Sequence, residues 1–257
     1  MRLMWITLFA SAATVFASRS PEVKQDIATE NITINELQIN ALPVSLPDLL
    51  TLVKVECSMI GEWPRGPTCG FHTASNTCTD GQIITDAILT RYEEAHDISQ
   101  KKAARQVGRR LKRMTKSMAR AKLFLEKTGQ HAFDEAATLN GCDHACMTRY
   151  TKAIIKELSV TTRAAILKLG LQALGKRIQP VFIALSGLVI TVNGLVGGTL
   201  VFITTLVNAL LLAIAAGIAF LGHLVSDTER AKAGGPGGPK TAEIANLLDG
   251  LGWVVDQ

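Results

Sequence analysis

The chain has 257 residues, of which 47% are hydrophobic and 19% are charged, and its formal net charge is +5. Aromatic residues make up only 5% of it, which leaves few side chains for stacking on bases and argues against a nucleic-acid partner. The mild excess of positive charge suits an anionic surface as partner, and the length suffices for one large domain or two small ones.

Residues 1–17 have the pattern of a secretory signal peptide. They contain one basic residue, Arg2, then an apolar run from Leu3 to Phe16, and small residues near Ala17. The apolar run is too short to be a transmembrane helix. We therefore expect cleavage near Ala17 and a secreted mature chain.

The N-terminal segment, residues 18–82, contains a glycosylation sequon and three cysteines. The sequon begins at Asn31 and is used only where it is exposed. Two prolines favour an extended entry followed by a short helix at residues 48–53. The three cysteines fall in residues 57–82, which are rich in glycine and proline, at Cys57, Cys69 and Cys78.

The other two cysteines, Cys142 and Cys146, lie near a predicted helix start. In an oxidising compartment cysteines pair where geometry allows, and five cysteines leave one over. We expect two of the N-terminal three to bridge to Cys142 and Cys146. His144 adds metal-ligand chemistry between them, but a structural zinc site needs four ligands and a helix turns His144 away from both sulfurs. We expect no metal and no cofactor.

The segment 83–179 is predicted to be helical. Residues 82–127 contain no proline, and Gly129 lies just beyond the predicted end of this first helix. Apolar residues recur in it at alternating steps of four and three: Val107, Leu111, Met114, Met118, Ala121 and Leu125. This spacing predicts a buried seam. Further helices are predicted at residues 130–139, 142–158 and 161–179, with apolar faces suited to a bundle core.

Basic residues surround that seam between residues 99 and 127: Lys101, Lys102, Arg105, Arg109, Arg110, Lys112, Arg113, Lys116, Arg120, Lys122 and Lys127. The pattern is that of a basic amphipathic helix, and three interpretations compete. It binds anionic lipid headgroups, or it is the solvated outer face of a bundle, or its dibasic pairs Arg109-Arg110 and Lys112-Arg113 are processing sites. An intact helix would protect these pairs from a protease.

An apolar stretch, residues 180–226, dominates the C-terminal half. Residues 178–226 contain no Asp, Glu, Lys or Arg, and one straight helix through them would be far longer than a bilayer of about 30 Å requires. We predict a helical hairpin with arms at residues 181–196 and 199–225. Gly197-Gly198 provides the turn and Pro180 begins the first arm.

Small residues recur along this hairpin at helical spacing: Gly194 with Gly198, and Ala209 with Ala213 and Gly217. Such rows let helices approach closely in lipid, so they are candidates for membrane insertion and for a seam between the arms or between copies. The alternative is that alanine and glycine are common in any buried helix.

Basic residues flank the hairpin on both sides, whereas its turn has none: Lys176, Arg177, Arg230 and Lys232. Basic loops tend to stay on the cytosolic side, so this arrangement suits ordinary two-pass insertion poorly. It fits insertion from outside, after the hairpin has been buried against its own protein or a partner. The remaining segment, 227–257, is predicted to contain a linker at residues 233–239 and a short last helix at 241–248.

No phosphate-binding loop, zinc-protease helix or nucleophile elbow occurs in the sequence, and we expect no enzymatic activity. The predicted fold is all-α: a helical bundle with a long apolar helical hairpin and a small disulfide-stabilised loop region.

The order of these features resembles the layout of yeast and fungal killer preprotoxins: a signal peptide, a cysteine-bearing segment, the internal pairs Arg109-Arg110 and Lys112-Arg113, further cysteines and an apolar hairpin. That resemblance implies a secreted precursor, cut by a kexin-type protease into disulfide-linked or separate subunits, that acts on target membranes.

We therefore expect a secreted, membrane-associated, toxin-like protein that inserts its hairpin into a target lipid bilayer, as a homo-oligomer or as disulfide-linked fragments. One alternative is a resident integral membrane protein of the secretory pathway or cell surface, with an adhesion or scaffold role. Another is a soluble helical protein whose apolar pair is its core.

Overall fold

A computed structural model of the chain describes residues 45–61, 88–89, 92, 99–140 and 142–257, and these lie within one unit, residues 43–257. Regular structure among the described residues is entirely α-helical, which confirms the all-α class. The helices are α2 (Leu46–Ile60), α4 (Gln100–Asn140), α5 (His144–Leu169), α6 (Leu171–Leu195), α7 (Val201–His223), α8 (Asp227–Gly234) and α9 (Pro239–Val255).

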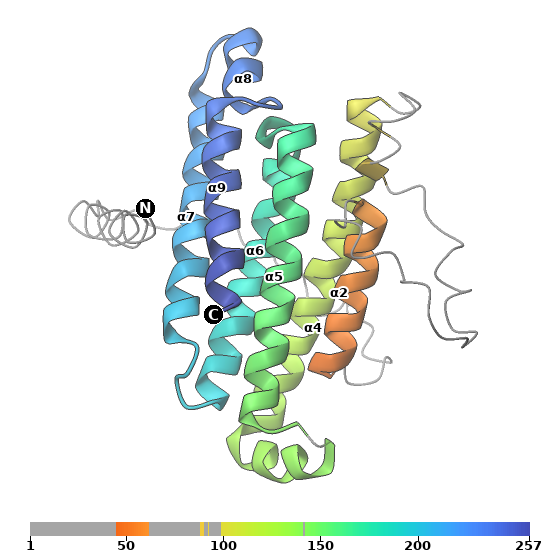
Figure 1. Cartoon of the computed structure of the whole chain (residues 1–257), viewed down its shortest axis with the longest axis vertical. Coiled ribbons are helices and arrows are strands. Elements are labelled where there is room, and N and C mark those ends of the chain that lie inside the picture. The colour runs from red at the N-terminus through yellow and green to blue at the C-terminus, as the bar shows by residue number, and fades with distance from the viewer. Residues whose placement is uncertain (1–44, 62–87, 90–91, 93–98, 141) are drawn as a thin grey trace, which may run out of the picture. The chain divides into compact units, whose positions relative to one another are not determined.

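The long helices form a bundle of two layers (Figure 1). In one layer α6 packs between α4 and α7, and in the other α5 packs between α2 and α9. The layers meet where α5 packs on α6, α7 on α9, and α2 on α4. Consecutive helices from α4 to α7 run antiparallel (Figure 1). Because α4 and α7 pack on either side of α6 and α5 packs across it, α6 has long helices on three sides. The helices α4 and α7 lie at opposite edges of one layer.

The predicted seam of the basic helix is confirmed. All six of its residues, from Val107 to Leu125, are buried against α6 and α2. The helix does not end before Gly129, however, because α4 continues to Asn140. The short helix predicted at residues 48–53 is also longer: α2 begins after Ser45, whose hydroxyl accepts from the Asp48 amide, and it extends to Ile60.

The predicted boundary between the helices at 142–158 and 161–179 is wrong. The helix α5 continues without a break through Ser159, Thr161 and Thr162, all of which are buried in the packing of the bundle. The break falls instead at Gly170, where φ is +83°. A methyl group there would come within 2.7 Å of the Gly234 carbonyl oxygen, so α8 is held closely against this turn.

The expected start of the hairpin at Pro180 is also wrong, because Pro180 lies inside α6. A proline removes one hydrogen bond from a helix interior. The cost is limited here because Pro180 and Lys176 are both exposed, so water can reach the carbonyl group that loses its partner. The first arm therefore begins well before Pro180, at Leu171.

The C-terminal segment is more ordered than predicted. The predicted linker at 233–239 is a tight turn between α8 and α9, and α9 extends beyond residues 241–248 in both directions. Pro239 occupies the first turn of α9, where a missing amide costs nothing. The Thr241 hydroxyl accepts from the Leu171 amide at 3.2 Å, so α9 also caps the start of α6.

Candidate membrane-binding surface

Two helices among the described residues, α6 and α7, are long and apolar enough to span a membrane, and α7 is the more apolar of the two. They differ in how the bundle covers them. In the most apolar 18-residue stretch of each helix, 44% of the residues are buried for α6 and only 28% for α7. The helix best suited to lipid is therefore also the less covered one.

The turn between these helices is the one that the sequence predicted. Gly197 and Gly198 have φ values of +66° and +84°, which side chains other than glycine rarely adopt. The Asn193 side chain stabilises this turn, since its Oδ1 accepts from the Leu200 amide at 2.8 Å. Asn193 thus has a structural role at the end of the hairpin.

The two arms contact each other closely at one end and through one polar pair farther along. The Ser186 hydroxyl donates to Oδ1 of Asn208 at 2.5 Å. Gly175 faces Ile218, and a methyl group at position 175 would come within 2.9 Å of that side chain. Because polar groups in apolar surroundings need partners, the Ser186–Asn208 bond favours keeping the arms paired wherever the hairpin lies.

One side of α7 is buried and the opposite side is open. The buried residues follow the steps of a core-facing helix: Ile203, Val207, Leu210, Ile214, Gly217 and Leu221. The exposed residues up to Phe220 form a second stripe, which we call the α7 outer face: Val201, Phe202, Thr205, Ala209, Leu212, Ala216, Ala219 and Phe220. None of these eight is charged; the exposed Gly222 and His223 follow in the last turn of α7. Phe202 is 64% exposed and Leu212 is 59% exposed, so the face presents large apolar side chains to solvent.

The small residues predicted to mark insertion do not form a common seam between the arms. Gly194 is exposed, with open space where a methyl group would lie, and Gly198 belongs to the turn. Ala209 lies on the α7 outer face, Ala213 is half-buried, and Gly217 is buried against Leu171. Gly175, which the sequence did not single out, provides the closer approach between the arms.

Two of the basic residues that flank the hairpin have structural roles. The Arg177 side chain lies across Gly108 and donates to the Ala104 carbonyl, which ties α6 to α4. The Arg230 guanidinium donates to the carbonyl oxygens of Leu221 and Leu224, at 2.9 and 2.7 Å, and so caps the end of α7. Their positions therefore follow partly from packing.

The basic residues of α4 form a surface of their own. Those exposed and without an ion pair to another described residue form what we call the basic ridge: Lys101, Lys102, Arg105, Arg109, Lys112, Lys116, Arg120 and Lys127. Since the apolar seam of α4 is buried in the bundle, it is not available to lipid in this structure. The interaction open to α4 here is electrostatic.

The dibasic pairs lie in the middle of this continuous helix. Glu56, which is 8% exposed, accepts from Arg110 at 3.3 Å and from Arg113 at 3.5 Å, so α2 is held to α4 at this point. Leu111, between the pairs, is buried. Cleavage beside Arg109-Arg110 or Lys112-Arg113 would require local opening of α4, and processing stays a prediction.

The expected cysteine bridges are wrong, because Cys142 and Cys146 pair with each other. Asp143, between them, is the N-terminal cap of α5, and its side chain accepts from the Cys146 amide at 2.8 Å. Cys142 therefore lies just before the first turn of α5, within bonding distance of Cys146. Cys57 is a free thiol buried in α2 rather than in a loop, and burial raises its pKa to about 12. Cys69 and Cys78 lie outside the described residues, as do Asn31 and the expected signal peptide.

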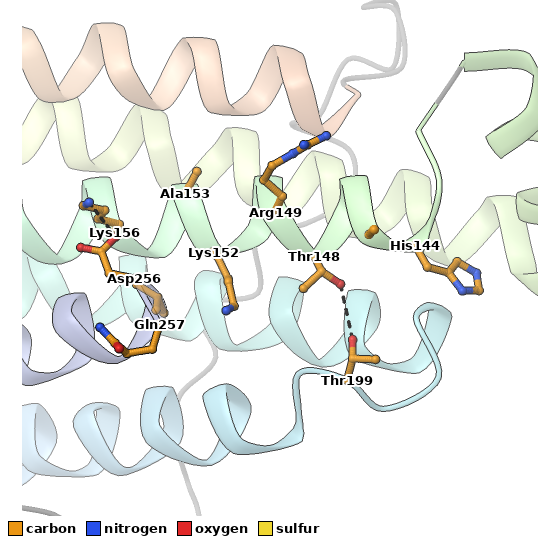
Figure 2. A pocket seen from close by; sticks show the side chains of 11 residues that line it. His144, Thr148, Arg149, Lys152, Ala153, Lys156, Thr199, Asp256 and Gln257 are labelled. Atoms are coloured by element: carbon orange, nitrogen blue, oxygen red, sulfur yellow. Dashed lines mark hydrogen bonds and ion pairs between the residues drawn. The ribbon is translucent and has the colours of Figure 1, made fainter.

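A groove of about 760 Å³ lies where α9 ends partway along α5, beside the hairpin turn (Figure 2). Thr148 and Thr199 share a hydrogen bond of 3.4 Å across it, and Lys156 pairs with Asp256 at 2.6 Å. Lys152 points toward the hairpin, whereas Arg149 points away from it (Figure 2). The cationic groups that line the groove therefore do not converge on one point.

The chain matches no family model, no curated protein and no solved structure. The relationship to killer preprotoxins stays a prediction based on layout. The two unusual surfaces of the bundle, the α7 outer face and the basic ridge, are therefore the basis for assigning a function.

Proposed function

We propose that this protein is a secreted, toxin-like, membrane-active protein that binds a target lipid bilayer through the α7 outer face and inserts the α6–α7 hairpin. The observation that carries this proposal is the exposure of α7. It is the more apolar of the two span-length helices, yet only 28% of its most apolar stretch is buried. Its outer face displays Phe202, Leu212 and Phe220 without a single charge.

Transfer of this face into lipid is favourable because it removes apolar area from water, at roughly 25 cal/mol for each Å². It also requires little rearrangement, since the contact with another helix is at Phe220, over whose ring the Lys240 ammonium of α9 lies at 5.3 Å from the centroid. The backbone of α7 is already satisfied by its own helical hydrogen bonds, as a lipid environment demands. Binding through α7 is therefore the first step.

Insertion of the whole hairpin is a second and costlier step. Residues such as Phe182, Leu185 and Val189 of α6 are fully buried, and Arg177 ties α6 to α4. Hence α6 leaves α4 and α5 only if the bundle opens, with lipid replacing the lost contacts. The Ser186–Asn208 bond joins the two arms themselves, so it survives this transfer.

The test is flotation of purified protein with neutral phosphatidylcholine vesicles. Leu212→Lys places a charge in the centre of the α7 outer face, where it opposes entry into the bilayer. We expect it to lower the bound fraction at least tenfold. Val55→Lys is the matched control, because Val55 is 50% exposed but lies on α2. It should float like the wild type, and thermal melting should show both variants folded.

Equal flotation of wild type and Leu212→Lys would reject the role of α7. Alkaline carbonate extraction of producing cells tests the alternative of a resident membrane protein. The secreted, toxin-like protein appears in the medium and is released by carbonate. A protein that stays in the membrane pellet and never reaches the medium would favour a resident adhesion or scaffold component.

A further inference from the structure

The basic ridge and the α7 outer face lie on opposite edges of one layer. Both α4 and α7 pack against α6, which lies between them (Figure 1). A flat bilayer that contacts the outer face of α7 at one edge therefore leaves the α4 edge free. The two surfaces also differ in chemistry: one is uncharged and apolar, the other is cationic.

The ridge runs along one face of the continuous helix α4. From Lys101 to Lys127 it spans about 39 Å at 1.5 Å for each helical residue. The only acidic residue between positions 99 and 127 is Glu126, and it pairs with Lys122 at 3.3 Å. The charge of the ridge is therefore not neutralised by the described part of the chain.

This shape and charge fit an anionic bilayer. A plane of phosphate headgroups can meet every cation along an edge helix at once, and each cation near such a surface strengthens adsorption about fivefold. The ridge contains no aromatic residue on which bases could stack, and it is an edge rather than a groove that would hold a single strand. Charge complementarity and shape both favour a lipid surface.

We propose that the basic ridge is a second membrane-binding surface, which holds an anionic bilayer while α7 occupies another, so that the protein bridges and clusters vesicles. The first contact, through α7, rests on the function proposed above. The second depends only on the ridge. Clustering requires both contacts on one molecule, and therefore distinguishes bridging from simple adsorption.

The test uses the full-length secreted protein and vesicles of phosphatidylcholine with phosphatidylglycerol, with light scattering as the measure of clustering. The ridge variant combines Arg105→Gln, Arg109→Gln, Lys112→Gln and Lys116→Gln. The control removes four cations from helices outside the hairpin: Lys54→Gln, Arg149→Gln, Lys152→Gln and Lys232→Gln. All eight side chains lack an ion pair with another described residue. Flotation is measured on the same samples.

We expect wild type and control to cluster anionic vesicles, and clustering to fall with added salt. The ridge variant should still float with vesicles through α7 but should lose at least tenfold in clustering. In the Leu212→Lys background, adsorption to anionic vesicles should persist and should fall about fivefold for each ridge charge removed. If Leu212→Lys still adsorbs to anionic vesicles and also floats with neutral vesicles like the wild type, the result supports lipid binding by the ridge. The same result rejects the function proposed for α7.

Three results would overturn the proposal. The first is a wild type that floats with anionic vesicles but does not cluster them. The second is a ridge variant that clusters vesicles as well as the control does. The third is a ridge variant that loses binding to single-stranded RNA while its vesicle clustering is unchanged, because the ridge would then be a nucleic-acid surface.

Discussion

The two arms of the hairpin, α6 and α7, have similar length and are both apolar enough to span a membrane, but the bundle covers them differently. Three long helices, α4, α5 and α7, pack on α6, whereas α7 has two long neighbours, α6 and α9. The exposed row of α6 has only two large apolar side chains, Ile183 and Ile190, and the Lys122 side chain lies close to Gly187 between them, whereas the α7 outer face has four: Val201, Phe202, Leu212 and Phe220. Position in the layer therefore acts together with hydropathy: the more apolar helix is also the one at the edge.

The largest effect that this comparison predicts concerns two phenylalanines. Phe182 of α6 is fully buried and Phe202 of α7 is 64% exposed. We expect Phe182→Ala to lower the free energy of unfolding by about 3–5 kcal/mol, because it leaves a cavity in the core. Phe202→Ala should change it by less than about 0.5 kcal/mol. Urea denaturation measures both, and a similar loss for the two variants would contradict the assignment of α7 to the surface.

A smaller effect tests the close approach of the arms. An alanine at position 175 would bring its methyl group within 2.9 Å of Ile218, whereas position 194 has open space. We expect Gly175→Ala to destabilise the protein by about 1–3 kcal/mol through overpacking. Gly194→Ala should stabilise it by at most about 0.5 kcal/mol, because alanine has the higher helix propensity but position 194 lies in the last turn of α6. Thermal melting compares the two, and a stabilising Gly175→Ala would mean that the arms are farther apart.

Features with strong local signals could be predicted from the sequence. The heptad spacing of the α4 seam identified six residues that are all buried, and Gly197-Gly198 identified the turn of the hairpin. Both signals act within a few residues, through helical periodicity and through the backbone freedom of glycine.

Features that depend on distant contacts could not be predicted in this way. Pro180 reads as a helix start, but packing of α6 against three neighbours keeps the helix continuous through it. Ser159 and Thr161 read as a break, yet they are buried within α5. The open face of α7 has the same cause: both of its sides are apolar in sequence, and only the arrangement of the bundle determines which one is covered.

The measurement that tests the central claim most directly is photo-crosslinking to lipid. Benzoylphenylalanine would replace Leu212 on the α7 outer face or Val55 on α2, two exposed positions on different sides of the bundle. After incubation with vesicles carrying radiolabelled phosphatidylcholine, irradiation should label the position-212 protein and leave the position-55 protein unlabelled. Absence of label at position 212, or equal labelling at both positions, would contradict the claim that α7 enters the bilayer.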